Sequence, residues 1–210
     1  MPTHESERNR IGGDAERFAD ARRLGEGAEG GTWTALDTHQ GRRRVVLKYV
    51  PEERAGHVRR AFKILRRVSS PHLPAALELL NHEGGGAWLV SAWIPGAPIP
   101  SATAAVDAVL DELHALVHAL RALHGVGTHH GDVSLGNVIR TPEGELVLID
   151  FGQLGCHGCG TPGFLAPEVL AGGGGPAADV FALGCLLCAR PFAHVPCTKP
   201  ADVARPRRPG

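Results

Sequence analysis

The period of the apolar residues changes near residue 95, and this change constrains the fold more than any other feature of the chain. Before it, short β-branched segments such as "RRRVVLKYV" alternate with glycine-rich turns. After it, residues 104–124 are mostly apolar over a length typical of a buried helix. The pattern predicts an α+β protein, with a small antiparallel sheet domain over residues 18–94 and a mainly helical domain over residues 95–190.

One helix is expected within the first domain. The segment "HVRRAFKILRRV", residues 57–68, places apolar side chains at three- and four-residue intervals, which indicates an amphipathic helix packed on the sheet. The two ends of the chain differ from this pattern. Residues 1–17 are polar with mixed charge, and residues 191–210 are rich in proline and arginine without periodicity, so both are predicted to lack regular structure.

Composition excludes several classes of partner. Lysine plus arginine and aspartate plus glutamate both total 22, so no net charge draws the chain to nucleic acid or to an anionic membrane. No apolar run resembles a signal sequence or reaches 18 residues. We therefore expect a cytoplasmic protein. Its five cysteines, an odd number without an export signal, favour reduced thiols over a disulfide framework.

Four polar residues stand at the ends of apolar segments or in one loop. Lys48 lies in "VVLK", Asp132 and Asn137 are five residues apart in "HHGDVSLGNVI", and Asp150 follows "LVLI". Taken singly, each could be a cap, a turn residue or a solvent-facing side chain. The set is more informative, because the chain has only three lysines and three asparagines. An ammonium, a proton-accepting carboxylate and two oxygen ligands for Mg²⁺ are what phosphoryl transfer requires.

A glycine pattern precedes the lysine. Gly25, Gly27 and Gly30 match G-x-G-x-x-G between two expected strands, a context in which backbone N–H groups can lie over phosphates. It differs from the strand-to-helix context of a dinucleotide fold or a Walker loop. With 28 glycines in the chain, an ordinary glycine-rich hairpin remains an alternative.

Together these segments resemble a bacterial serine/threonine protein kinase over roughly residues 18–190. "LGEGAEGGTW" resembles the glycine loop, "HGDVSLGN" the catalytic loop, "DFG" the metal motif and "GTPGFLAPE" the substrate-side segment. The resemblance implies a two-lobed fold and ATP-dependent transfer of phosphate to serine or threonine of protein substrates. A small-molecule kinase is an alternative, since "HGD" and "IDFG" also occur in aminoglycoside- and choline-kinase relatives, although "GTPGFLAPE" speaks against it.

The resemblance also implies roles for individual residues. Asp132 would be the base, Lys48 the phosphate anchor, and Asn137 and Asp150 the Mg²⁺ ligands. In "LVSAWI", Ser91 would be the gatekeeper of the hinge, and the backbones of Ala92 and Ile94 would contact the adenine of ATP. Further along, Thr161 would help to dock the substrate, and Asp179 would brace the catalytic loop.

Several positions depart from the family pattern. Ala61 stands where a glutamate normally pairs with the strand lysine, Ser134 where a lysine neutralises the transferring phosphate, and Gly131 where an arginine reads an activating phosphate. Thr161 is the only hydroxyl between Asp150 and Glu168, so we expect no phosphorylation switch there. Relatives also continue for several helices beyond residue 190. A degenerate kinase that binds nucleotide or a partner without turnover is therefore an alternative.

Two C-x-x-C pairs remain to be explained. Cys156 and Cys159 flank a histidine, and Cys185 and Cys188 follow in an apolar segment. Two such pairs can bind zinc, and one alone can serve in redox chemistry. Cysteines within an apolar helix also behave as small hydrophobes, which is the simpler interpretation of the second pair.

Overall fold

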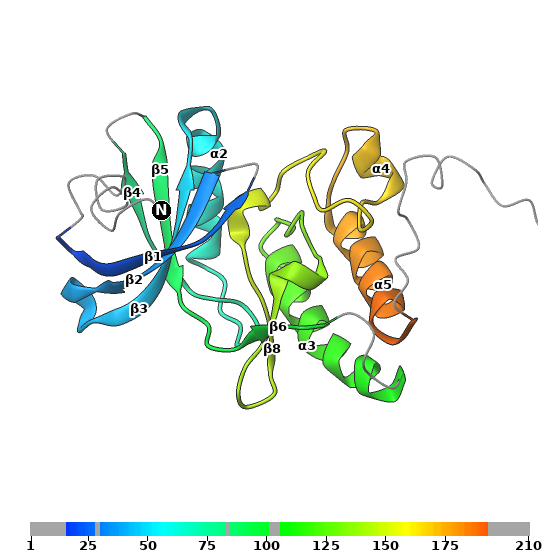
Figure 1. Cartoon of the computed structure of the whole chain (residues 1–210). Helices are drawn as coiled ribbons and strands as arrows, with labels where there is room; N and C mark the ends of the chain where they lie inside the picture. Colours follow the sequence, from blue (N-terminus) through cyan, green and yellow to red (C-terminus); the bar gives the residue numbers. More distant parts are fainter. Residues whose placement is uncertain (1–15, 28–29, 83–84, 101–105, 193–210) are drawn as a thin grey trace, which may run out of the picture. The chain divides into compact units, whose positions relative to one another are not determined.

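The computed structural model describes residues 16–27, 30–82, 85–100 and 106–192. The chain divides into two compact units, coloured along the sequence in Figure 1. The sheet unit comprises residues 1–67 and 74–93, and the helical unit comprises residues 68–73 and 94–210. The segment 68–73 belongs to the helical unit, where the Leu148 amide donates to the His72 carbonyl at 3.0 Å.

The sheet unit contains one antiparallel sheet of five strands in the order β1-β2-β3-β5-β4. The strands are β1 (Phe18–Gly27), β2 (Gly30–Asp37), β3 (Arg43–Val50), β4 (Ala76–Asn81) and β5 (Ala87–Ala92). A 3-10 helix, η2 (Thr38–Gln40), links β2 to β3. Strands β1 and β4 are the two outer strands.

Side chains alternate between the two faces of this sheet. One face carries a buried cluster in which Trp33 and Trp88 meet edge to face with ring centroids 5.1 Å apart. Leu47 on β3 belongs to this cluster, so its neighbour Lys48 lies on the opposite face. The members of the cluster are Phe18, Ala21, Trp33, Ala35, Val45, Leu47, Trp88 and Val90.

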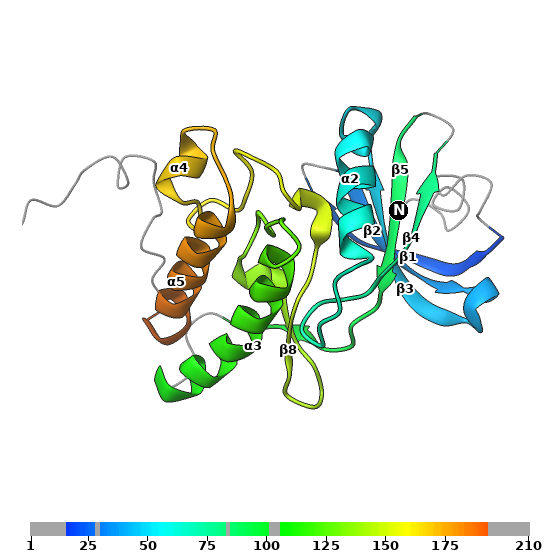
Figure 2. The same cartoon turned by 180° about the vertical axis from the view of Figure 1, so that it is seen from behind.

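Helix α2 (Glu52–Leu65) packs against β3, β4 and β5, as Figure 2 shows from behind. Its buried residues are Ala55, Val58, Ala61 and Leu65. The predicted amphipathic helix is therefore confirmed, although it begins and ends earlier than residues 57–68. Glutamates in its first turn and a lysine in its last turn complement the helix dipole, which extends the helix toward β3.

Arg17 fastens the start of β1 to two other strands. Its Nε and Nη2 donate to the two carboxylate oxygens of Asp37 on β2, at 2.9 and 2.7 Å, and Nη2 also donates to Glu78 on β4 at 2.6 Å. The guanidinium holds the pKa of the buried Asp37 carboxyl below its ordinary value. Arg17 is thus part of the folded sheet unit, which corrects the prediction for residues 1–17; residues 1–15 lie outside the described part.

The helical unit is built around α3 (Val106–His124) and α5 (Pro176–Phe192), which lie side by side in both views (Figures 1 and 2). A short helix, α4 (Pro167–Leu170), precedes α5. A three-stranded sheet contains β6 (Ala97–Pro98), β7 (Val138–Arg140) and β8 (Leu146–Leu148). Two 3-10 helices complete the unit: η3 (Leu135–Asn137) directly precedes β7, and η4 (Phe151–Gln153) follows β8.

These elements confirm the α+β prediction of a small antiparallel sheet with one helix and a mainly helical second part. The helix expected over residues 104–124 is present from Val106, residues 104–105 lying outside the described part, and the hairpin joined by "TPEGE" is present as well. Helix α5 continues to Phe192, past the predicted limit of residue 190, and residues 193–210 of the proposed tail lie outside the described part. Among the helices that the structure describes, none has the length and apolar character needed to span a bilayer.

Candidate active site

The carboxylate of Asp132 is the centre of a hydrogen-bond cluster in the helical unit. Its Oδ1 accepts from both the backbone amide and the hydroxyl of Thr161, at 2.8 and 2.6 Å. Its Oδ2 accepts from the side-chain amide of Asn137 at 2.8 Å. The side chain of Asp132 is thereby fixed from two directions, by residues 5 and 29 positions further along the chain.

The amide of Asn137 is oriented by the same contacts. Its Nδ2 also donates to the backbone oxygen of Asp132 at 2.9 Å, so the Nδ2 end is fully turned toward Asp132. Among the described residues no group donates a hydrogen bond to the other end of this amide, the Asn137 Oδ1. A hard, outward-facing oxygen of this kind suits Mg²⁺, which usually takes only one or two protein ligands beside phosphates and water.

His130 joins the catalytic loop to the strand that carries Asp150. The ring is completely buried, with Nε2 3.1 Å from the Ile149 carbonyl and Nδ1 accepting from the Asp132 amide at 3.3 Å. Burial lowers the pKa of His130, which favours the neutral ring. A neutral ring that donates through Nε2 and accepts through Nδ1 satisfies both contacts.

Asp150 follows immediately after this contact and has an unusual backbone. Its φ is 71°, in the left-handed region where aspartate is tolerated better than most residues. The Ile149 amide donates to the Asn137 carbonyl at 2.8 Å, so the backbone leading into Asp150 is bonded to the predicted metal-ligand loop. Strained backbone of this kind is concentrated at functional sites.

Asp179 makes the bracing contact that the family resemblance implied. It lies in the first turn of α5 and is 2% exposed. Its Oδ2 accepts from the His130 amide at 2.8 Å, and its Oδ1 accepts from the Gly131 amide at 2.9 Å. The ring of His124, at the end of α3, places Nε2 2.8 Å from the same Oδ2. One buried carboxylate thus holds the catalytic loop between two helices.

Two of the departures from the family pattern have structural correlates. Gly131 has a φ of 82°, and a Cβ at this position would lie 2.5 Å from the Gln153 carbonyl oxygen. A side chain such as the arginine found in relatives would not fit this backbone. Ser134 is 4% exposed and precedes η3, so the loop that carries Asp132 and Asn137 has no cation at this position.

In the sheet unit, Lys48 lies on β3 between Thr32 of β2 and Leu89 of β5. Its side chain is half-buried. Ala61 is buried on α2, while the carboxyl group of Glu52 lies beside Gly85 at the β4–β5 connection. The middle of α2 therefore offers no glutamate at position 61 to pair with Lys48. Glu52, in the first turn of α2, is directed to the end of the β4–β5 hairpin.

The three glycines of the predicted phosphate loop lie in the β1–β2 hairpin. Gly25 pairs with Thr32, and Gly27 pairs with Gly30 across the turn, whose residues 28–29 lie outside the described part. A Cβ on Gly25 would meet nothing within 4 Å, so packing does not require glycine there. Glycine in a strand costs stability, and a common reason for it is the close approach of a ligand to the backbone.

The predicted hinge residues lie at and just after the end of β5. Ser91 pairs with Val46 and Ala92 with Val45 on β3, and the Ala92 amide donates to the Ala75 carbonyl at 2.9 Å. Ile94 comes two residues after the end of β5 and belongs to the helical unit. The helical unit brings Asp132, Asn137 and Thr161 together around the loop, whereas the convergence of the sheet-unit residues with them stays a prediction.

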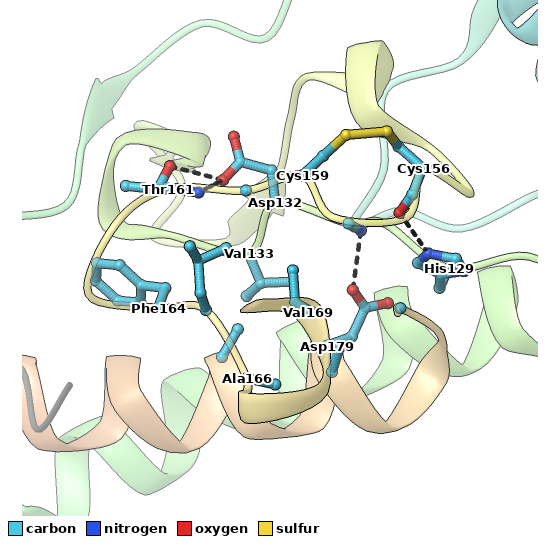
Figure 3. Close-up of a pocket in the computed structure, with 16 residues that line it drawn as sticks. His129, Asp132, Val133, Cys156, Cys159, Thr161, Phe164, Ala166, Val169 and Asp179 are labelled. Atoms are coloured by element: carbon cyan, nitrogen blue, oxygen red, sulfur yellow. Dashed lines mark hydrogen bonds between the residues drawn. A yellow bond between two sulfur atoms is a disulfide. The ribbon is translucent and has the colours of Figure 1, made fainter. Parts of the chain in front are cut away.

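The expectation of reduced thiols is wrong for one pair, because Cys156 and Cys159 form a disulfide. Figure 3 shows this disulfide at the rim of a pocket that also contains Asp132, Thr161 and Asp179. A count of cysteines cannot reveal local pairing, although the C-x-x-C spacing permits it. Within the described part of the chain Cys185 and Cys188 form no disulfide; both lie in α5, the first of them buried, as expected of small apolar side chains.

Sequence reasoning missed one part of the site. The role of His124 was not predicted, because twelve histidines are scattered over the chain and only its position beside Asp179 distinguishes it. His130 was expected to have a structural role in the catalytic loop, and its ring contacts with Ile149 and Asp132 fit that role. Its place directly before Gly131 in "HHGD" was the signal for His130. His124 has no comparable local pattern.

Comparison with known proteins adds the family. A model of the protein kinase domain matches residues 18–205. The serine/threonine-protein kinase PknA of Mycobacterium tuberculosis is 29% identical over 195 residues, covering 80% of this chain and 45% of that protein. The DNA damage-responsive serine/threonine-protein kinase RqkA of Deinococcus radiodurans is 31% identical over 186 residues, covering 78% of this chain and 28% of the relative.

A plant protein gives a similar result. The CBL-interacting serine/threonine-protein kinase 13 of Arabidopsis thaliana is 28% identical over 195 residues, covering 82% of this chain and 38% of that protein. The chain thus spans less than half the length of each of these three relatives. Since the family model covers most of the sequence and the catalytic loop has its hydrogen bonds in place, the chain belongs to the protein kinase family.

Proposed function

We propose that this chain is the kinase domain of a serine/threonine protein kinase that uses ATP and Mg²⁺ to phosphorylate protein substrates. The observation that carries the proposal is the Asp132 carboxylate, held by Thr161 on one oxygen and by Asn137 on the other. Fixed orientation matters because this reaction depends on positioning and electrostatic stabilisation more than on covalent chemistry.

Asp132 is suited to accept the proton of a substrate hydroxyl. Its Oδ1 already accepts two hydrogen bonds, while Oδ2 accepts one and retains a second lone pair. Thr161 comes from the segment that the family uses to dock substrates, so its contact couples that segment to the base. A substrate hydroxyl presented at Oδ2 would become a better nucleophile as its proton transfers.

The nucleotide and metal have residues that fit them. Asn137 Oδ1 and the carboxylate of Asp150 would hold Mg²⁺, which when bound neutralises charge on the transferring phosphate. Lys48 would bind phosphate oxygens, and the hairpin containing Gly25, Gly27 and Gly30 would cover them. The backbones of Ala92 and Ile94 would contact the adenine. The open space above Gly25 supports this assignment of the hairpin.

A second candidate is a nucleotide-binding protein of the same fold with little or no turnover. It is favoured by the buried Ser134 on the catalytic loop and by the buried Ala61 on α2. Both positions lack the charge that relatives supply there. Loss of one stabilising group in a transition state costs about 10²–10³-fold in rate, so the two hypotheses differ in a measurable way.

The decisive test compares radiolabelled phosphate transfer from ATP by the wild-type chain and by Asp132→Asn. We expect transfer to serine and threonine of a generic protein substrate to fall by about 10²–10⁴-fold, the usual contribution of a catalytic base. Asp20→Asn is the matched control, because Asp20 is a surface carboxylate on β1 whose partners in the described part of the chain are arginines. Its activity should equal that of the wild type.

Nucleotide binding is measured on the same samples. Wild-type protein that binds ATP with Mg²⁺ but transfers no phosphate would establish the second candidate. Equal labelling by wild type and Asp132→Asn would remove Asp132 as the base. Circular dichroism of each variant verifies that the comparison concerns folded protein.

A further inference from the structure

The disulfide between Cys156 and Cys159 closes a loop of four residues in the segment between η4 and α4. Both side chains are partly exposed, and both line the pocket that contains Asp132 and Thr161 (Figure 3). A cross-link over so short a loop removes less chain entropy than one over a long loop. Its main effect is therefore expected on the local segment rather than on the whole fold.

The loop is anchored on two neighbouring segments. The Gly155 amide donates to the His129 carbonyl at 2.8 Å, and the ring Nε2 of His129 lies 3.1 Å from the Cys156 carbonyl, as the dashed line in Figure 3 shows. The Gly158 amide donates to the Gly173 carbonyl, beyond α4, at 2.8 Å. The four-residue loop thus connects the catalytic loop with the end of α4.

A single residue separates this loop from Thr161. That residue, Gly160, has a φ of 137°, and a Cβ there would lie 3.1 Å from the Gly131 carbonyl oxygen. Because only this closely packed glycine separates the two residues, the position of Cys159 limits where Thr161 can lie. Thr161 in turn makes both contacts to Asp132 Oδ1.

We propose that Cys156 and Cys159 form a reversible thiol–disulfide site. Its redox state determines how firmly Thr161 keeps its two hydrogen bonds to Asp132. In the disulfide form the loop is closed and Thr161 is held against the base. In the dithiol form the loop is open, and Thr161 is released for part of the time. The effect on catalysis rests on the proposed kinase function, whereas the thiol–disulfide exchange does not.

The exchange needs only a dithiol reductant. One thiolate of the reductant attacks a sulfur of the pair, forming a mixed disulfide and expelling the other cysteine as a thiolate, which takes up a proton. The second thiol of the reductant then displaces the remaining cysteine and closes its own disulfide. Two electrons pass to the protein, two cysteine thiols form, and the reverse reaction requires an oxidised dithiol.

A regulatory role is favoured over a purely structural one if the chain resides in the cytoplasm, as its sequence predicts. Disulfides in reducing compartments are uncommon, and those that form there are mostly transient and redox-sensing or catalytic. Between Asp150 and Glu168 the only hydroxyl is that of Thr161, which is already bonded to Asp132. A covalent change at the cysteines can therefore act where phosphorylation has no other acceptor.

The test equilibrates the chain with reduced and oxidised dithiothreitol in graded ratios. Alkylation and peptide mapping report the state of the pair, hydrogen exchange reports the Thr161 amide, and phosphate transfer reports activity. On reduction we expect both cysteines to become alkylated together and the Thr161 amide to exchange about tenfold faster. The kcat/KM for the protein substrate should fall about tenfold, while the KM for ATP changes less than about twofold.

Matched variants isolate the pair. The double variant Cys156→Ser/Cys159→Ser should resemble the reduced wild type in both buffers, and Cys188→Ser, on α5 outside the pocket, should switch like the wild type. If the hydrogen exchange of the Thr161 amide does not change when the cysteine pair is converted between disulfide and dithiol, the proposed switch is wrong. A pair that never oxidises would also overturn it. Responsive exchange in a chain without phosphate transfer would support the switch and overturn the proposed function instead.

Discussion

Replacing Asp179 by asparagine removes one acceptor from a carboxylate that is 2% exposed and makes three contacts. The least costly orientation keeps the oxygen at the Oδ2 position, which serves His124 and His130, and puts the new NH₂ group opposite the Gly131 amide. One hydrogen bond to a charged group, worth about 1.5–3 kcal/mol, is then lost. The Gly131 amide is also left without an acceptor, at a cost of about 1–3 kcal/mol.

Together the two contributions give an expected loss of about 2.5–6 kcal/mol in the free energy of unfolding. Urea denaturation followed by circular dichroism measures it, with an unchanged m-value showing that the same surface unfolds. The control is Glu143→Gln, which removes an exposed carboxylate from the β7–β8 turn and should change stability by less than about 0.5 kcal/mol. A loss below about 1 kcal/mol for Asp179→Asn would refute the view that this carboxylate holds the catalytic loop.

Two further predictions concern stability. Arg17 lowers the pKa of Asp37, so the ionised Asp37 stabilises the fold above the ordinary carboxyl pKa, and this stabilisation is lost as the pH falls through the lowered pKa. The variant Asp37→Asn should therefore be less stable than the wild type at pH 7. Its stability, measured by thermal unfolding, should also fall less steeply at acid pH. A fall at acid pH identical to that of the wild type would contradict this. Gly131→Ala should lose about 2–4 kcal/mol by urea unfolding because of its positive φ and the nearby Gln153 oxygen, whereas Gly136→Ala, with nothing within 4 Å, should lose almost nothing. Equal losses for the two alanines would show that the backbone of the loop relaxes freely.

The sequence predicted the elements with a strong period and missed those without one. The apolar stripe that includes Val58 and Leu65 predicted α2 because its side chains recur every three to four positions, and both residues are buried in the structure. The strand β4 was not predicted, since "ALELLN" does not alternate and its residues are only half-buried at the outer edge of the sheet. The two-residue β6 in "PGAPIP" was too short to have a period.

The candidate site was predictable where spacing along one loop decides the geometry. Asp132 and Asn137 are close in sequence, and their side chains bond directly. The contact of Thr161 with Asp132 joins residues 29 positions apart, so its geometry required the fold even though Thr161 itself was identified from a motif. The disulfide was missed because composition describes the whole chain, whereas pairing depends on the distance between two particular sulfurs.

The contacts of Arg17 have a consequence for whether two copies of this protein can pair through the edges of their sheets. The sheet has outer strands β1 and β4, and an outer strand offers unpaired backbone groups to any extended chain that approaches it. Because the Arg17 guanidinium reaches from the start of β1 to Glu78 on β4, the sheet must curl so that its two outer strands lie close together at that end. A second copy that tried to add a strand there would first have to pull that charged group away from both carboxylates.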